Sequence, residues 1–287
     1  MNFYSPLRYP GGKNKLSKFI AEICVVNKID GHYIEPYAGG ASVALFLLFN
    51  GYVREITIND YDKAVYAFWY SVLNHPKELC RKIRDTKVNL NTWRRQRKIQ
   101  DNKENEKDLL KLGFSTLFLN RTNYSGILDG GMIGGIAQSS PYKIDCRFKK
   151  DELVERIKFI AAHKKNIHLE NMDALNLIKK IKKDKNTFFY FDPPYYLKGP
   201  SLYMNHYKHE DHEKVSKEIS KIKNAKWIVS YDNTPEIRKM YKTYNKKTYE
   251  FFYTAYNARI GKEVLFFSKN TNVSKISSPL SICSKKI

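Results

Sequence analysis

The chain of 287 residues is long enough for one large α/β domain or for a domain that carries an insertion. Lys and Arg outnumber Asp and Glu by 51 to 29, which gives a formal net charge of +22. A protein this basic usually binds a polyanion, most often nucleic acid, although a Lys-rich composition typical of AT-rich genomes accounts for part of the charge. The four cysteines have no C-x-x-C spacing, which argues against a zinc site or a redox pair. No segment has the length of a membrane span or the pattern of a signal peptide, so we expect a soluble, cytoplasmic protein.

The first quarter of the chain alternates strand and helix patterns. Strands are expected at His32–Glu35 and 55–58, and helices at Ser42–Phe49 and 63–73. This β-α-β-α order predicts a parallel sheet.

Residues 75–150 interrupt that rhythm and are strongly basic near their start. Between residues 81 and 98 only Asp85 is acidic, whereas the basic side chains are Arg81, Lys82, Arg84, Lys87, Arg94, Arg95, Arg97 and Lys98. A Gly-rich stretch follows at 126–135. We therefore expect an inserted helical subdomain with a hairpin or loop.

The alternation returns after residue 150. Helices are expected at 151–162, 174–182 and 212–222, and strands at 166–169, Thr187–Phe191 and 227–230. The uninterrupted apolar run at 187–191 is typical of a central strand buried on both faces. Residues 248–253 and 264–268 are expected to pair antiparallel, and the tail from residue 270 to fray.

The strongest chemical signal is Asp192-Pro193-Pro194-Tyr195, directly after the expected central strand. Ligands of open α/β sheets bind at the carboxyl ends of strands. There the Asp192 carboxylate and the Pro193 carbonyl offer two acceptors for an aromatic amine, and the prolines stiffen the loop. Tyr195 offers a ring on which an extruded base can stack. A Pro-stiffened turn with an exposed Tyr is the simpler alternative.

Two weaker signals lie near the N-terminus. Glu35-Pro36-Tyr37-Ala38-Gly39 joins an acid at a strand end to a Gly turn and a helix, and Asp60 ends the next strand. This arrangement is typical of nucleotide binding, although a strict G-x-G-x-x-G is absent. Tyr9-Pro10-Gly11-Gly12-Lys13 is not a Walker A motif and alone would indicate only a turn.

Together and in this order, these motifs resemble the alpha group of amino-methyltransferases, the D12-class DNA adenine methylase family. Further matches are Asp173 before the catalytic strand, the block Gly261 to Phe266, and the segment Leu119 to Gly126, which is similar to the family's target-recognition element. The stretch from Gly130 to Ser140 departs from the members that read GATC, which predicts a short target other than GATC.

The resemblance implies a Rossmann-like S-adenosylmethionine-dependent methyltransferase fold that carries an inserted helical DNA-recognition subdomain. It divides the chain into a cofactor half (1–74), a target-recognition subdomain (75–150), a catalytic half (151–269) and a flexible tail (270–287). It further implies N6 methylation of a flipped adenine in double-stranded DNA, with no metal and no membrane, and a restriction endonuclease as a possible partner.

The site residues follow from the matched motifs. The catalytic loop is expected to comprise Asp192, Pro193, Pro194 and Tyr195. The residues expected to hold S-adenosylmethionine are Tyr9, Lys13, Glu35, Gly39, Asp60 and Asp173. Those expected to hold DNA are Arg94, Arg95, Arg97, Asn120, Arg121, Asn123, Lys143 and Arg147.

Other interpretations stay open at this point. An RNA base methyltransferase acting on N2 of guanine or N6 of adenine can also carry D-P-P-Y, and a catalytically silent nucleic-acid-binding protein would share the charge. N4-cytosine methylation shares the chemistry, but its loop usually begins with Ser. His209-Glu210-Asp211-His212-Glu213 could suggest a metal, although acids at a helix start are common for dipole reasons.

Overall fold

The computed structural model describes residues 4–8, 13–197, 207–253 and 259–273. Its contacts divide the chain into two compact units. We call Met1–Gly12 with Asp60–Asn171 the helical unit, and Lys13–Asn59 with Met172–Ile287 the sheet unit. The division of the chain by function at residues 75, 151 and 270 stays a prediction.

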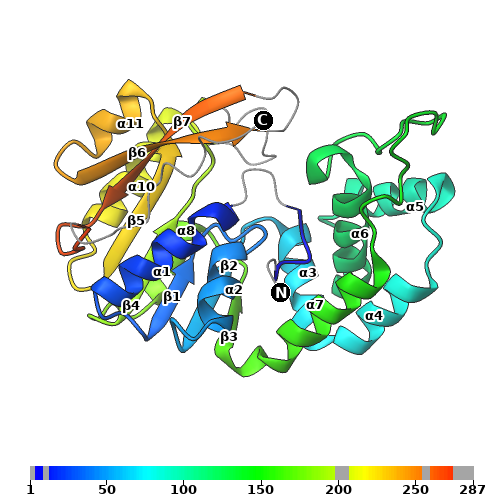
Figure 1. Cartoon of the computed structure of the whole chain (residues 1–287), viewed down its shortest axis with the longest axis horizontal. Coiled ribbons are helices and arrows are strands. Elements are labelled where there is room, and N and C mark those ends of the chain that lie inside the picture. Colours follow the sequence, from blue (N-terminus) through cyan, green and yellow to red (C-terminus); the bar gives the residue numbers. More distant parts are fainter. Residues whose placement is uncertain (1–3, 9–12, 198–206, 254–258, 274–287) are drawn as a thin grey trace. The chain divides into compact units, whose positions relative to one another are not determined.

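Six strands of the sheet unit lie in the order β2-β1-β4-β5-β7-β6 (Figure 1). The first four are mutually parallel, and β7 pairs antiparallel with both β5 and β6. The strands are β1 His32–Glu35, β2 Glu55–Asn59, β4 Thr187–Phe191, β5 Lys226–Asp232, β6 Asn245–Tyr253 and β7 Arg259–Phe267. This mixed sheet confirms the predicted Rossmann-like class, including the closing antiparallel pair.

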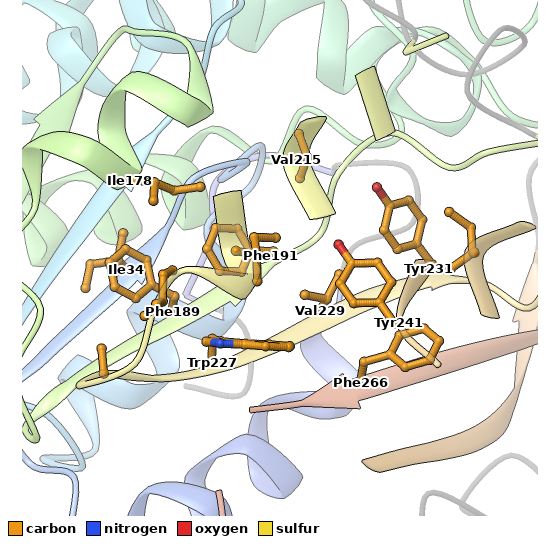
Figure 2. Packing of buried hydrophobic residues seen from close by; sticks show 14 of the residues in the cluster. Ile34, Ile178, Phe189, Phe191, Val215, Trp227, Val229, Tyr231, Tyr241 and Phe266 are labelled. Atoms are coloured by element: carbon orange, nitrogen blue, oxygen red, sulfur yellow. The ribbon is translucent and has the colours of Figure 1, made fainter. Parts of the chain in front are cut away.

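One face of this sheet forms a large hydrophobic core. Side chains alternate across a strand, so Ile34, Phe189, Phe191 and Val229 share one face and are fully buried. Figure 2 shows them with Trp227 and with side chains of the covering helices. Those helices are α8 Ala174–Lys180, α10 His209–Ser220 and α11 Pro235–Met240.

The opposite face carries several buried polar side chains beside apolar ones. Helix α1 (Ser17–Val26), which is not among the expected helices, packs here, and its Phe19 ring meets Phe267 edge-on at 6.5 Å. Helix α2 (Ser42–Phe49) follows β1. The same alternation that buries Phe189 and Phe191 turns Glu35, Tyr190 and Ser230 toward this second face.

The helical unit confirms the predicted helical character of the insertion. Its elements are α3 Lys63–Asn74, α4 Pro76–Asp85, α5 Leu90–Asp101, α6 Leu109–Thr122, the short η2 Tyr124–Gly126, α7 Lys150–Ala162, η3 Lys164–Asn166 and β3 Ile167–Glu170. Helix α6 is buried from Leu112 to its end and packs against α3 and α5. A Cβ on Gly113 would lie 2.4 Å from the Ala67 carbonyl oxygen, so glycine permits the close approach of α3 and α6.

Several predicted boundaries shift, and the starts of α10 and β7 are examples with a clear cause. Helix α10 begins at His209 instead of residue 212, because Asp211 Oδ2 accepts a bond of 3.2 Å from the Lys208 amide and caps the first turn. Strand β7 begins at Arg259, five residues before the expected start, because it pairs with β6 along its full length. In the part of the chain that the structure describes, no helix is long and apolar enough to cross a membrane.

Candidate active site

The D-P-P-Y loop leaves the carboxyl end of β4 in the sheet unit. Asp192 Oδ2 lies 3.1 Å from Lys13 Nζ, and one fifth of the Asp192 side chain is exposed. Its other oxygen, Oδ1, is buried and makes no hydrogen bond to any described residue. A buried carboxylate oxygen without a donor is costly unless a ligand supplies one, so Oδ1 is suited to accept from a substrate.

Lys13, which the resemblance assigns to the cofactor, forms an ion pair with this carboxylate. Its role toward a cofactor stays a prediction. Lys13 opens the short helix η1 (Lys13–Leu16), is 4% exposed, and its ammonium is 3.8 Å from Glu263 Oε2. The same ammonium is 4.9 Å from the centre of the Tyr195 ring. Glu263 is fully buried on β7 and accepts a hydrogen bond from the Tyr249 hydroxyl.

Opposing effects set the ionisation of Asp192. Burial raises its pKa, Lys13 lowers it, and the negative charge of Glu263 raises it again, for a final pKa of about 6. The carboxylate is therefore charged at neutral pH and is protonated in mild acid.

Asp232, which is not among the predicted site residues, anchors the loop. It ends β5 and is 5% exposed. Its Oδ1 accepts from the Tyr196 amide and its Oδ2 from the Leu197 amide, both at 2.9 Å. The signal was present, because an acid at the end of the strand beside β4 must lie at the same sheet edge, but the expected strand stopped at residue 230.

The remaining loop residues are largely enclosed. Pro193 is buried and Tyr195 is 3% exposed, with its ring in the hydrophobic core. Stacking of a base on Tyr195 stays a prediction.

Glu35 is the last residue of β1 and is 4% exposed. Its Oε1 accepts from the Tyr33 hydroxyl at 3.1 Å and from the Ala44 amide at 3.0 Å, so it caps the first turn of α2. Burial raises the pKa of Glu35 to about 8. Gly39 has a φ of +46°, which lets the chain turn sharply into the helix.

The other predicted cofactor acids lie in different units. Asp173, in the sheet unit, caps α8 through a bond of 2.8 Å from the Leu175 amide to its Oδ1. Asp60 belongs to the helical unit, and its Oδ1 accepts from the Asp62 amide at 3.0 Å. Tyr9 lies outside the described residues. Their roles toward a cofactor stay predictions.

Two amides of the predicted DNA-binding element are used inside the helical unit. Asn120, 2% exposed, accepts from the Arg8 amide at 2.7 Å and donates to the Gly126 carbonyl at 2.8 Å. Asn123, fully buried, accepts from Trp93 Nε1 at 2.7 Å and donates to the Ile127 carbonyl at 2.9 Å. In this structure both amides shape the recognition segment, and a direct DNA contact would require these bonds to break.

Four arginines gather near the end of α6. Arg121 is 9% exposed and donates to the Pro6 carbonyl at 2.7 Å. Burial and then the charges of Arg156, Arg8 and Arg147 lower its pKa to about 9. Arg8 Nη1 is buried and has no hydrogen-bond partner among the described residues. We call these four side chains the arginine cluster. Glu152 is 3.6 Å from Arg156 and compensates part of its charge, and the excess positive charge favours an anion.

The basic run of α5 divides by role. Arg97 bonds to the Leu128 carbonyl at 2.7 Å and pairs with Asp101 at 3.1 Å, so it holds the recognition loop. Arg94 and Arg95 are exposed. Arg95 also lines an open hollow of about 600 Å³ between α4 and α5. The charged side chains that line this basic hollow are Arg81, Lys82, Asp85, Lys87 and Arg95.

The loop after η2 is held by its own side chains. Gln138 Nε2 donates to the Ile133 carbonyl at 2.8 Å, and its Oε1 accepts from the Ile144 amide at 2.9 Å. The exposed Lys143 donates to the Gln138 carbonyl, and Arg147 is exposed. Their contacts with DNA and the expected target other than GATC stay predictions.

One histidine of α10 has a role inside the fold. His212 is 1% exposed, and its Nδ1 lies 2.9 Å from the Tyr231 hydroxyl. Burial lowers the pKa of His212 to about 4, so it is neutral at physiological pH. Within the described ranges, no group of three or more His, Cys, Asp or Glu side chains is arranged to hold a metal ion.

Comparison with known proteins agrees with these motifs. The chain is 26% identical over 263 residues to the Type II methyltransferase M.MjaIII of Methanocaldococcus jannaschii, which covers 84% of this chain and 89% of that protein. Among solved structures, it is similar to the rRNA methyltransferase aviRa of Streptomyces viridochromogenes (11% identity, TM-score 0.38, 92% of this chain and 87% of that one). It is also similar to an O-methyltransferase of Thermotoga maritima (8% identity, TM-score 0.36, 88% and 64%).

The family match covers most of the chain. It extends over residues 9–255 and includes the N-terminal Gly-Gly-Lys, the Glu35 turn, the recognition segment and the D-P-P-Y loop. The resemblance seen in the sequence is thereby confirmed. The chain belongs to the family of D12 class N6 adenine-specific DNA methyltransferases.

Proposed function

We propose that this DNA adenine methyltransferase uses S-adenosylmethionine and acts on an adenine flipped out of the duplex. The observation that carries the proposal is the buried Asp192 Oδ1, an acceptor without a donor at the carboxyl end of β4. Ligands of open α/β sheets bind at this edge. A base amine brought there would supply the missing donor.

The sheet unit offers groups that fit the cofactor. The positive φ values of Gly39 and Ala41 bring the chain around from β1 into α2 at the carboxyl edge of the sheet. Glu35 and Asp173 place carboxyl groups beside elements that begin at this edge, and acids suit ribose hydroxyls and cationic groups. With Gly39, they are our candidates to hold S-adenosylmethionine, and the family motif adds Tyr9 and Asp60.

The residues of the loop prepare the amine for reaction. The lone pair of an exocyclic aromatic amine is delocalised into the ring, so acceptors on its two N–H groups favour the tetrahedral form. Asp192 Oδ1 and the Pro193 carbonyl are the two acceptors. When bound, the cofactor supplies a methyl group whose bond to positively charged sulfur breaks as the bond to N6 forms. The nitrogen then loses one proton, and the Asp192 carboxylate is the base within reach.

The helical unit supplies the DNA surface in this proposal. The exposed Arg94, the basic hollow and the arginine cluster offer positive charge to backbone phosphates. The similarity to a Type II methyltransferase supports a cognate restriction endonuclease as partner.

The test is incubation with isotope-labelled S-adenosylmethionine and unmethylated duplex DNA, followed by nucleoside analysis and single-molecule sequencing. We expect label in N6-methyladenine at one short sequence. A restriction endonuclease that cuts at that sequence can then be tested for whether the modified DNA resists it. RNA and DNA lacking adenine serve as controls. Label found only in RNA or in N4-methylcytosine would refute the proposal.

DNA binding should depend steeply on salt, and the basic hollow should carry part of that dependence. Replacing Arg81, Lys87 and Arg95 with Gln should reduce the log–log slope of affinity against salt by about 0.9 for each phosphate that is no longer neutralised. The measurement is fluorescence anisotropy with labelled duplex at several salt concentrations. The control variant replaces Lys149, Lys158 and Lys165 with Gln. These exposed lysines lie on or near α7, and their removal changes the net charge by the same amount. Equal slopes for the two triple variants would assign the hollow no specific role.

A further inference from the structure

The catalytic carboxylate belongs to a buried charged triad that joins three distant parts of the sheet unit. Lys13 comes from η1, Asp192 from the end of β4 and Glu263 from β7. The ammonium is 3.1 Å from one carboxylate and 3.8 Å from the other. The side chain of Lys13 is 4% exposed, and that of Glu263 is fully buried.

Stability alone is a poor explanation for such a triad. Removing charges from water costs several kcal/mol per ion, and apolar residues of similar volume often stabilise a protein more than a buried ion pair. Here Asp192 and Glu263 share one cation, so the repulsion between the two carboxylates adds to the cost of desolvation. A charged arrangement of this kind at a reacting carboxylate is more readily explained by chemistry.

We propose that Lys13 and Glu263 are positioning residues for methyl transfer: Lys13 keeps Asp192 ionised and aimed, and Glu263 holds Lys13 in place. The inference rests on the proposed function of Asp192 and goes beyond it. Lys13 bonds Oδ2, which leaves Oδ1 for the substrate amine. A charged carboxylate accepts more strongly than a neutral acid, so Asp192 works best in its ionised form.

Glu263 is itself held by β6. The Tyr249 hydroxyl, on the strand paired with β7, donates to Glu263 Oε2, the same oxygen that faces Lys13. This contact fixes Glu263, and Glu263 fixes the ammonium between the two acids. The two partners thus act on Asp192 in opposite directions, because the cation favours its charged form and the second anion opposes it.

Other groups face Asp192 from the neighbouring strands. They are the acid of Glu35 on β1 and the hydroxyls of Tyr190 on β4 and of Ser230 and Tyr231 on β5. The Ser230 hydroxyl favours the charged form of Asp192, although its geometry does not complete a hydrogen bond. Burial raises the pKa of Glu35 to about 8 and that of both tyrosines well above 10. These groups therefore stay neutral near pH 6, where Asp192 titrates.

The experiment is the pH dependence of kcat for N6-methyladenine formation in the full-length protein. For the unchanged chain, activity should rise with pH through about 6 as Asp192 loses its proton. In Lys13→Met this rise should move to higher pH by about 1–3 units, since an opposite charge nearby shifts a carboxyl by that amount. In Glu263→Gln it should move to lower pH, because the repelling charge is gone. Lys13→Arg should restore most of the normal profile.

Lys18→Met is the matched control, because Lys18 is an exposed lysine of the adjoining helix α1, and its profile should not move. If Lys13→Met does not fold, the pH profile of Glu263→Gln is sufficient to test the inference. This variant is expected to fold, since its amide oxygen can still accept a hydrogen bond from Tyr249. Unshifted profiles, or a rise at higher pH in Glu263→Gln, would overturn the inference. If the unchanged chain makes no N6-methyladenine, it is the proposed function that fails.

Discussion

Replacing Asp192 with Ala is expected to reduce kcat for DNA methylation by at least about 10²–10³-fold, while S-adenosylmethionine still binds. The carboxylate offers Oδ1 to the reacting amine and lies outside the acids that we assign to the cofactor. Its loss removes an interaction that strengthens as the nitrogen becomes tetrahedral, and it leaves the ammonium of Lys13 with Glu263. The effect should therefore appear in kcat much more than in the affinity for the cofactor.

The measurement combines a tritium-transfer assay under single-turnover conditions with calorimetry of cofactor binding. Asp192→Asn separates charge from shape, because it keeps an acceptor oxygen but loses the negative charge, and it should also be severely impaired. Glu155→Ala is the control, because Glu155 is an exposed acid of α7 and its replacement should leave kcat unchanged. Near-normal turnover in both Asp192 variants would show that this carboxylate does not handle the amine.

The second large effect is expected for Asp232→Ala, which should lower kcat by about 10²-fold without unfolding the sheet unit. Asp232 is the acceptor for two consecutive backbone amides, of Tyr196 and Leu197, directly after the D-P-P-Y sequence. Hydrogen bonds to a charged group contribute about 1.5–3 kcal/mol each, and their loss frees the end of the loop. A misplacement of about 1 Å at a reacting centre costs roughly 10²-fold in rate.

The pH profile distinguishes this role from that of the triad. Asp232→Ala should lower the plateau of kcat but leave the rise near pH 6 in place, since Lys13 and Glu263 still set the ionisation of Asp192. Asn233→Ala, the next position along the chain, is the control, and a thermal melt tests folding. An unchanged plateau would mean that the prolines alone hold the loop.

Much of the fold was accessible from local patterns. The run Thr187–Phe191 predicted a buried central strand because it contains no polar interruption, and that strand lies between β1 and β5. The bounds of β1 and α2 were also predicted correctly, since the turn at Gly39 separates a short β-type run from an apolar helix. Helix α1 lay outside the predicted elements, although its buried Phe19, Ile20, Ile23 and Cys24 follow the spacing of one face of an amphipathic helix.

The candidate site divides in the same way. Residue types were enough to predict the family and the chemistry of the D-P-P-Y loop, because both depend on a contiguous motif that follows a strand. The folded chain was needed to show that Lys13 faces Asp192 and that Glu263 and Asp232 support it, since each of these contacts joins residues at least 35 positions apart. It was also needed to show that Asn120 and Asn123 are buried donors within the recognition segment. Burial and hydrogen-bond partners are properties of the folded neighbourhood, and no local pattern encodes them.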